Sequence, residues 1–296
     1  MGNESFPILN IKHFQDTSDQ ESFYANIFSN HLRCNHTEIT TPHKHDFYLS
    51  VCFTHGQGTH EIDFQTFPIT AGSLYFLHPG QTHSWKLSDD IEGYIFFHSR
   101  NFYDSQYARK SITDFPLYHS SRFPPFLQLD PDQTQKAIDT FQSLLSEYPI
   151  PCLAKAEKVC SLLDVFYLDL SEQLIKLHSE APVQPHTYTS KINQLEQLIE
   201  HHFKHEKLPR VYAQKMNMTS KHLNRICKST LGKTTSELIN ARLLLESKRM
   251  LVHTDHPLSF AAYALGFKDY AYFSRWFKQQ TGKTPSQFKG QYHTSL

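Results

Sequence analysis

Three histidines are the residues of this chain whose types and spacing are best suited to chemistry: His43, His45 and His83. Two histidines separated by one residue on a strand face the same side, and a third from a later strand could complete a metal site. The same imidazoles could instead hold an organic molecule by hydrogen bonds, with aromatic side chains as pocket walls. The candidate pocket residues are His43, His45, Phe47, Phe76, His83 and Trp85.

Signatures of enzymes are largely absent from the sequence. It contains no G-x-S-x-G elbow, no P-loop, no H-E-x-x-H helix and no G-x-G-x-x-G fingerprint, and Gly56-Gln57-Gly58 is only a turn. We therefore predict no catalytic residues and no enzymatic activity.

A second group of candidate residues lies on two short helices in the last third of the chain. In Leu258–Phe288, Gly266 ends an apolar helix at a tight turn, and Asp269 can cap the helix that follows. Leu208–Gly232 repeats this arrangement, and both segments end alike, in LGKTTSEL and TGKTPSQF. The residues expected on the outer faces, and therefore in a DNA major groove, are Lys221, Asn224, Arg225, Lys228, Tyr270, Ala271, Ser274, Arg275 and Lys278.

At these helices the chain resembles the AraC/XylS family of bacterial transcription regulators. The matching motifs are Ala262, Gly266-Phe267, Tyr272-Phe273-Ser274-Arg275, Phe277-Lys278 and Gly282-Lys283-Thr284-Pro285. The resemblance covers about residues 191–289. It implies an all-helical domain that places two recognition helices in successive segments of the major groove, so double-stranded DNA is the expected partner.

Two earlier segments resemble the cupin-type sensor domain that is attached to many members of this family: HKHDFYL from His43 and AGSLYFLHPGQTHSW from Ala71. The resemblance implies a small-molecule effector in an N-terminal barrel and adds RNA polymerase as a candidate partner. In metal-binding cupins a carboxylate follows the second histidine by four or five positions, which are Leu49 and Ser50 here. We therefore expect an organic effector, no metal and no cofactor. The alternative is a metal-dependent cupin enzyme or a metal sensor fused to a DNA-binding domain.

Charge is unevenly spread along the chain, although the formal net charge is zero. From Tyr188 onward there are 17 Lys+Arg against 7 Asp+Glu, and the preceding residues hold 12 against 22. A basic segment joined to an acidic one is the pattern expected when only one half of a protein meets a polyanion.

The elements that must position the pocket residues are short strands. From Cys34 to His98, apolar or alternating segments separated by glycine and proline predict a small barrel, with a hairpin at His55–Gly58. Residues 1–30 are expected to form an arm or an edge strand. The predicted fold class is α+β with two domains: an N-terminal cupin-like β-barrel with dimerisation helices, and a C-terminal all-α domain with two helix-turn-helix motifs.

Helices are expected after the barrel. One begins at Asp130, and a longer one from Cys152 to His178 carries a wide apolar stripe: Val159, Leu162, Leu163, Phe166, Leu170 and Leu174. The stripe predicts a homodimer through this helix, or else a helix that covers the barrel of its own subunit. Residues 179–189 are interpreted as a linker, so the predicted domains are 1–178 and 190–296, with helix-turn-helix units near 208–230 and 258–280. A first helix of the second domain is expected at Lys191–Phe203, and another at Ser236–Val252, between the two units.

The five cysteines include no C-x-x-C pair, which favours structural thiols in a reducing compartment. The first residues show no signal-peptide pattern, and no apolar run is long enough to span a membrane. We therefore expect a cytoplasmic protein with no membrane partner.

Overall fold

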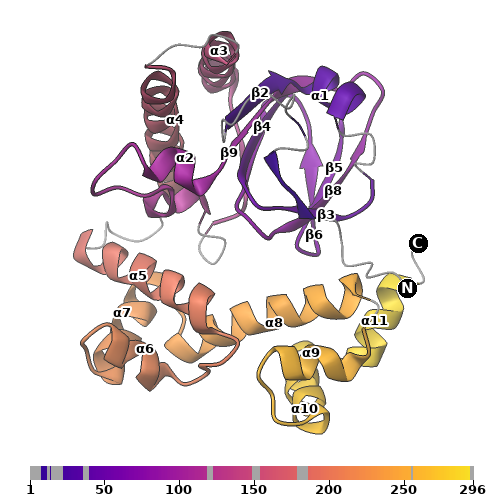
Figure 1. Cartoon of the computed structure of the whole chain (residues 1–296), viewed down its shortest axis with the longest axis vertical. Helices are drawn as coiled ribbons and strands as arrows, with labels where there is room; N and C mark the ends of the chain where they lie inside the picture. The colour runs from indigo at the N-terminus through magenta and orange to yellow at the C-terminus, as the bar shows by residue number, and fades with distance from the viewer. Residues whose placement is uncertain are drawn as a thin grey trace. The chain divides into compact units, whose positions relative to one another are not determined.

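A computed structural model describes residues 8–11, 14, 23–35, 40–118, 123–148, 154–178, 186–254 and 256–293. The chain divides into two compact units, one within Pro7–Glu180 and one within Ala181–Leu296 (Figure 1). In the part of the chain that the structure describes, no helix combines the length and apolar character needed to cross a membrane.

The described strands of the first unit form two five-stranded sheets. One sheet has the order β1 (Ile8–Leu9), β3 (His43–His45), β8 (Thr82–Leu87), β5 (Gly58–Ile62) and β6 (Gln65–Ile69). The other has the order β10 (Phe126–Gln128), β7 (Ser73–Leu77), β4 (Tyr48–His55), β9 (Glu92–His98) and β2 (Phe23–Ile27). The part of the predicted N-terminal arm that is described contributes an edge strand to each sheet, β1 and β2. Residues 1–7, 12–13 and 15–22 of that arm lie outside the described residues.

The second sheet is buried on both faces, and this explains its nearly continuous apolar strands. All five residues of β7 are buried. Tyr75 and Leu77 join an aromatic core between the two sheets, whereas Leu74 and Phe76 join a second core beneath the helices. The same strand therefore serves two hydrophobic cores, one on each of its faces.

The hairpin predicted at His55–Gly58 is wrong. β4 pairs with β7 and β9, whereas β5 pairs with β6 and β8, so the tight turn carries the chain from one sheet to the other. The hairpin in this region joins β5 to β6 through Asp63 and Phe64, which both have positive φ. Two-residue hairpin turns favour such backbone angles, but asparagine and glycine normally signal them.

The helices of the first unit follow or flank the sheets. Their bounds are α1 (Phe28–Asn35), α2 (Arg100–Asp104), the 3-10 turns η2 (Ile112–Asp114) and η3 (Pro116–Tyr118), α3 (Pro131–Glu147) and α4 (Lys155–His178). Asp130 caps α3 by accepting a hydrogen bond from Gln133 N, as the sequence predicts. α3 contacts β2, β4 and β9, and α4 packs beside α3 (Figure 1).

The predicted stripe of α4 faces its own subunit and not a dimer partner. Five of its six residues, Val159, Leu163, Phe166, Leu170 and Leu174, are buried in the core beneath the helices, and Leu162 packs against that core. The outer face of α4 carries a second apolar set, because Val165, Leu168 and Ile175 are 61%, 51% and 41% exposed. The predicted stripe therefore fits the alternative expectation, a helix that covers its own subunit, and these residues are not free to bind a second copy.

The second unit is all-helical in its described part. The bounds are α5 (His186–His202), α6 (Pro209–Lys215), α7 (Ser220–Leu231), α8 (Thr235–His253), α9 (Leu258–Ala264), α10 (Tyr270–Thr281) and α11 (Pro285–His293). α5 begins at His186, before the predicted Lys191, and residues 179–185 of the predicted linker lie outside the described residues. α8 contacts α5, α6 and α7 on one side and α9 and α11 on the other (Figure 1). The predicted fold class, with a sheet-rich first domain and a helix-turn-helix second domain, is confirmed.

Candidate functional site

Each helix-turn-helix unit is built by local backbone chemistry that the sequence encodes. α6 ends at a turn in which Asn217 has φ 53°, and Thr219 caps α7 by accepting a hydrogen bond from His222 N at 3.2 Å. α9 is followed by a turn in which Gly266 has φ 71°, and Asp269 caps α10 by accepting a hydrogen bond from Tyr272 N at 2.7 Å. Both turns require a left-handed residue, which asparagine and glycine tolerate best.

The second helix of each unit has one buried and one exposed face. Leu223, Ile226 and Cys227 of α7 are buried in the core of the second unit, as are Phe273 and Phe277 of α10. The predicted contact residues that are exposed on the opposite faces are Lys221, Arg225 and Lys228 on α7, and Ala271, Arg275 and Lys278 on α10. The two helices therefore present a similar cationic surface at equivalent positions.

Three predicted contact residues are less accessible. Asn224 Oδ1 accepts a hydrogen bond from Thr235 N at 3.1 Å, which ties α7 to the start of α8. Tyr270 is half-buried against the core of the second unit, and Ser274 is half-buried as well. Asn224 therefore has a structural function whether or not it also touches a ligand.

Sequence reasoning missed Tyr272, which is 53% exposed and lies one helical turn before Arg275. Both residues border a hollow of about 400 Å³ at the turn between α9 and α10. The other lining residues are Lys207, Gly266, Phe267, Lys268 and Asp269. The i, i+3 spacing of Tyr272 and Arg275 was the available signal, because residues three apart share a helix face.

Lys207 connects this turn to the segment between α5 and α6. Its Nζ donates hydrogen bonds to Lys204 O at 2.9 Å and to Gly266 O at 3.2 Å, and it lies 4.9 Å from the centre of the Phe267 ring. Partial burial lowers the pKa of Lys207. Lys207 therefore holds the turn between α9 and α10 against the segment between α5 and α6.

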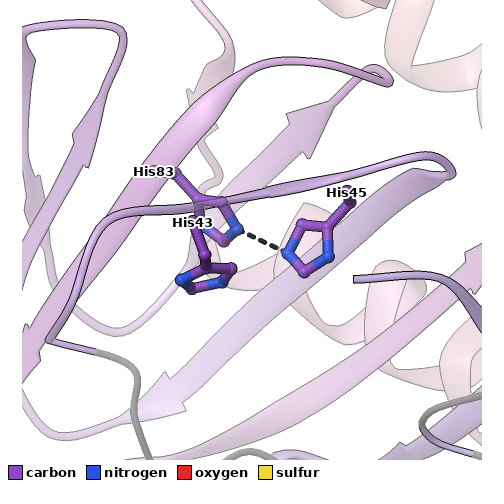
Figure 2. Close-up of side chains that lie close together, drawn as sticks. All are labelled: His43, His45 and His83. Atoms are coloured by element: carbon purple, nitrogen blue, oxygen red, sulfur yellow. Dashed lines mark hydrogen bonds between the residues drawn. The ribbon is translucent and has the colours of Figure 1, made fainter. Parts of the chain in front are cut away.

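The three candidate histidines of the first unit converge between β3 and β8 (Figure 2). His43 and His83 are directly opposite one another in the antiparallel pairing, and His45 Nε2 lies 2.6 Å from His83 Nε2. One ring nitrogen from each of the three residues lies within 4.8 Å of the other two. All three side chains are buried.

A second layer of hydrogen bonds orients these rings. His43 Nδ1 donates to Thr41 O at 2.9 Å, and His60 Nε2 lies 3.0 Å from His83 Nδ1. Burial lowers the pKa of His43 and lowers that of His60 well below its usual range. Because burial disfavours the imidazolium, His43 and His60 are neutral at pH 7. His60 was missed from the sequence, because only the pairing of β5 with β8 brings it beside His83.

The predicted aromatic walls are only partly assembled. Phe47 and Trp85 lie in the same core as the histidines, with ring centres 4.4 Å from His45 and 4.7 Å from His83, respectively. Phe76 is on the opposite face of its strand, where its side chain packs beneath the helices. Five of the six predicted pocket residues are therefore brought together, and Phe76 is not.

Two family models match the chain. The one described as an AraC-like ligand binding domain matches residues 29–97, and the one described as a helix-turn-helix domain matches residues 212–291. Together they cover about half of the chain, one match in each compact unit.

Similar proteins include the HTH-type transcriptional activator RhaS of Salmonella schwarzengrund. It is 22% identical over 252 residues, which are 83% of this chain and 86% of that protein. RhaS of Escherichia fergusonii is 21% identical over the same shares. Among solved structures, ToxT of Vibrio cholerae with bound unsaturated fatty acid is 16% identical, with a TM-score of 0.41 over 93% of this chain and 97% of ToxT.

The two matched models occur in the order of the two units, and the relatives that span most of the chain are transcription regulators. With an AraC-like ligand-binding domain followed by a helix-turn-helix domain, this chain belongs to the AraC/XylS family of transcription regulators.

Proposed function

We propose that the outer faces of α7 and α10 read two segments of a DNA major groove, and that an effector in the first unit controls this binding. One observation carries the proposal: the two helices expose similar cationic faces at equivalent positions while their other faces are buried. Arg225, Lys228, Arg275 and Lys278 offer the charge, and arginine or lysine pairs well with guanine in the major groove.

The exposed residues divide into two groups by expected role. Lys221, in the first turn of α7, and Arg275, near the middle of α10, lie on the exposed faces and are proposed to contact base edges. Lys268, beside the start of α10, is proposed to contact the DNA backbone, since helix N-termini and cations bind phosphate. We assign Asn224 a smaller part in base recognition because its side chain oxygen already accepts from Thr235 N.

The test measures binding of the full chain to an operator selected from random duplexes, and to random DNA. Arg275→Ala and Lys221→Ala should each lose about 1–3 kcal/mol on the operator and less on random DNA. Lys204→Ala is the matched control, because it removes a charge from the same unit outside α7 and α10. Equal losses for all three variants on both DNAs would contradict the assignment.

Salt dependence provides an independent measurement of the same interface. If about six phosphates are neutralised, affinity should fall about a thousandfold between 50 mM and 200 mM salt. Binding that does not respond to salt would exclude a major contribution from the cationic faces.

We also propose that two copies of the chain pair through the outer face of α4. Val165, Leu168 and Ile175 are exposed and follow the spacing of a two-helix seam, with Glu172 at the intervening position. Two adjacent DNA-binding units would then bind together, which raises affinity without new contacts. Contact with RNA polymerase, a cytoplasmic location and the absence of a catalytic activity remain predictions that fit a DNA-binding regulator.

The proposed effector site is the core around His43, His45 and His83, with Phe47 and Trp85 as walls. An effector that binds one arrangement of this unit better than another would shift the population of the two arrangements. His45→Ala and His83→Ala should abolish the response to effector and leave DNA binding without effector intact. Loss of DNA binding in both folded variants would contradict a purely regulatory site.

A further inference from the structure

Three imidazole nitrogens converge on one point of the first unit, although they come from two strands. His43 and His45 alternate on β3, and His83 lies opposite on β8, so backbone pairing fixes all three. Their donor atoms lie within 4.8 Å of one another, and imidazole nitrogens bound to one tetrahedral zinc ion lie about 3.3 Å apart. Small side-chain rotations would bring each nitrogen to bonding distance of one common ion.

The hydrogen bonds around the cluster direct lone pairs toward its centre. His43 Nδ1 must carry a proton because Thr41 O can only accept, so His43 Nε2 carries the lone pair. A proton on His83 Nδ1, donated to His60 Nε2 at 3.0 Å, would leave His83 Nε2 in the same state. Metal-bound histidines in general donate their second ring nitrogen to such an acceptor, which fixes the ring.

His45 Nε2 lies 2.6 Å from His83 Nε2, which is a close hydrogen bond with one proton between the two nitrogens. The two rings therefore already direct these nitrogens toward one another. A zinc ion that binds there would displace that proton, and the two nitrogens would move apart to about 3.3 Å.

We propose that His43, His45 and His83 bind one Zn²⁺-class ion, and that an oxygen atom of the effector takes its fourth coordination position. Among the described residues no carboxylate or thiolate joins the group, so the protein supplies three ligands and leaves one position open. The expectation of a metal-free cluster rested on the absence of a carboxylate at Leu49 and Ser50, but three imidazoles suffice for an open site. The effector half of this proposal rests on the proposed function, whereas the metal half rests on the geometry alone.

The test uses the untagged full chain, stripped of metal with a chelator and then titrated with Co²⁺ and, in competition, with Zn²⁺. We expect one Co²⁺ per chain with the visible absorption of a four-coordinate ion, and displacement by one Zn²⁺. Azide, a small anionic probe, should shift these bands by entering the open position. His45→Gln and His83→Asn should weaken binding at least a hundredfold, and His60→Ala should weaken it about 10- to 100-fold.

His31→Gln is the matched control, because His31 is a buried histidine of the same region outside the donor group. It should bind Co²⁺ as the unchanged protein does. The absence of visible Co²⁺ bands in the unchanged protein would overturn the proposal, and this result does not depend on whether the cluster variants fold. Undiminished Co²⁺ binding in folded His45→Gln and His83→Asn would overturn it as well. DNA binding is measured on the same samples: DNA binding without metal binding defeats this inference alone, and metal binding without DNA binding defeats the proposed function alone.

Discussion

Replacing Gly266 by alanine should destabilise the second unit far more than the same change at Gly232 or Gly282. All three glycines have positive φ, so each alanine costs about 1–2 kcal/mol for the left-handed backbone. A Cβ at Gly232 or Gly282 meets no atom within 4 Å, whereas one at Gly266 would lie 2.2 Å from Lys204 O. Backbone cannot yield there as a side chain can, so the turn must move away.

That movement breaks the contacts of Lys207 with the turn. Its hydrogen bond to Gly266 O is worth about 1.5 kcal/mol, at the low end for a charged donor because Lys207 is only half-buried. Its contact with the Phe267 ring adds about 0.5–1 kcal/mol. The expected loss for Gly266→Ala is therefore about 4 kcal/mol, a large part of the stability of an ordinary domain.

The assay is urea unfolding followed by fluorescence in a Trp85→Phe background. The chain has two tryptophans, so Trp276, which packs against the core of the second unit, is then the only one. With a slope of about 2 kcal/mol per molar urea, Gly266→Ala should lower the midpoint by about 2 M and the two control variants by less than about 1 M. Equal shifts at the three positions would refute the reasoning, because it would mean that the close approach to Lys204 costs nothing.

Three further outcomes are expected. Val165→Lys should give a folded monomer by light scattering, whereas Leu163→Lys should unfold the first unit because Leu163 is fully buried. A Val165→Lys variant that remains dimeric would exclude the outer face of α4 as the interface. Burial lowers the pKa of His98 to about 4 and outweighs its hydrogen bond to Ser99 O and the nearby Asp104, so the unfolded chain binds a proton more readily than the folded protein between pH 6.5 and pH 4. The free energy of unfolding should therefore fall by about 3 kcal/mol over this range because of His98. His98→Gln should lose that much less stability in parallel urea titrations. Asn224→Ala should cost about 1–3 kcal/mol in thermal unfolding by leaving the buried Thr235 without its acceptor, and Lys221→Ala, which is exposed, should leave the melting temperature nearly unchanged.

The helix-turn-helix region could be predicted closely from sequence because its signals are local. The turn at Gly266 and the cap at Asp269 depend on residues within a few positions of one another, and both are confirmed. The predicted repeat of this arrangement in Leu208–Gly232 is confirmed as well, with its turn at Asn217 and its cap at Thr219. Strand pairing depends instead on partners far along the chain. The short turn at His55–Gly58 therefore looked like a hairpin, although it connects two sheets.

The faces of buried elements were the other source of error. Phe76 lies in a strand that is apolar throughout, so its sequence does not distinguish the core between the sheets from the core beneath the helices. α4 similarly carries two apolar stripes, and only the packing of α3 and the second sheet decides which one is covered. The convergence of His43 and His45 with His83 was predictable, since alternation on a strand places the first two on one side. The participation of His60 was not, because it comes from the pairing of β5 with β8.

α8 sets an angle as well as a distance between the two helix-turn-helix units. Arg242 anchors it, since the guanidinium binds Glu200 of α5 at 2.6 Å and Glu246 one turn later at 3.0 Å, while also lying 4.1 Å from the centre of the Phe203 ring. An α-helix turns by about 100° per residue. One residue inserted after Arg242 would therefore rotate the second helix-turn-helix (α9 and α10) about the α8 axis by more than a quarter turn, while lengthening the helix by only about 1.5 Å. Under the proposed reading of DNA by α7 and α10, operators must match a fixed rotational phase between two groove segments. A change of one residue in α8 would then alter which DNA spacing is read without touching either helix.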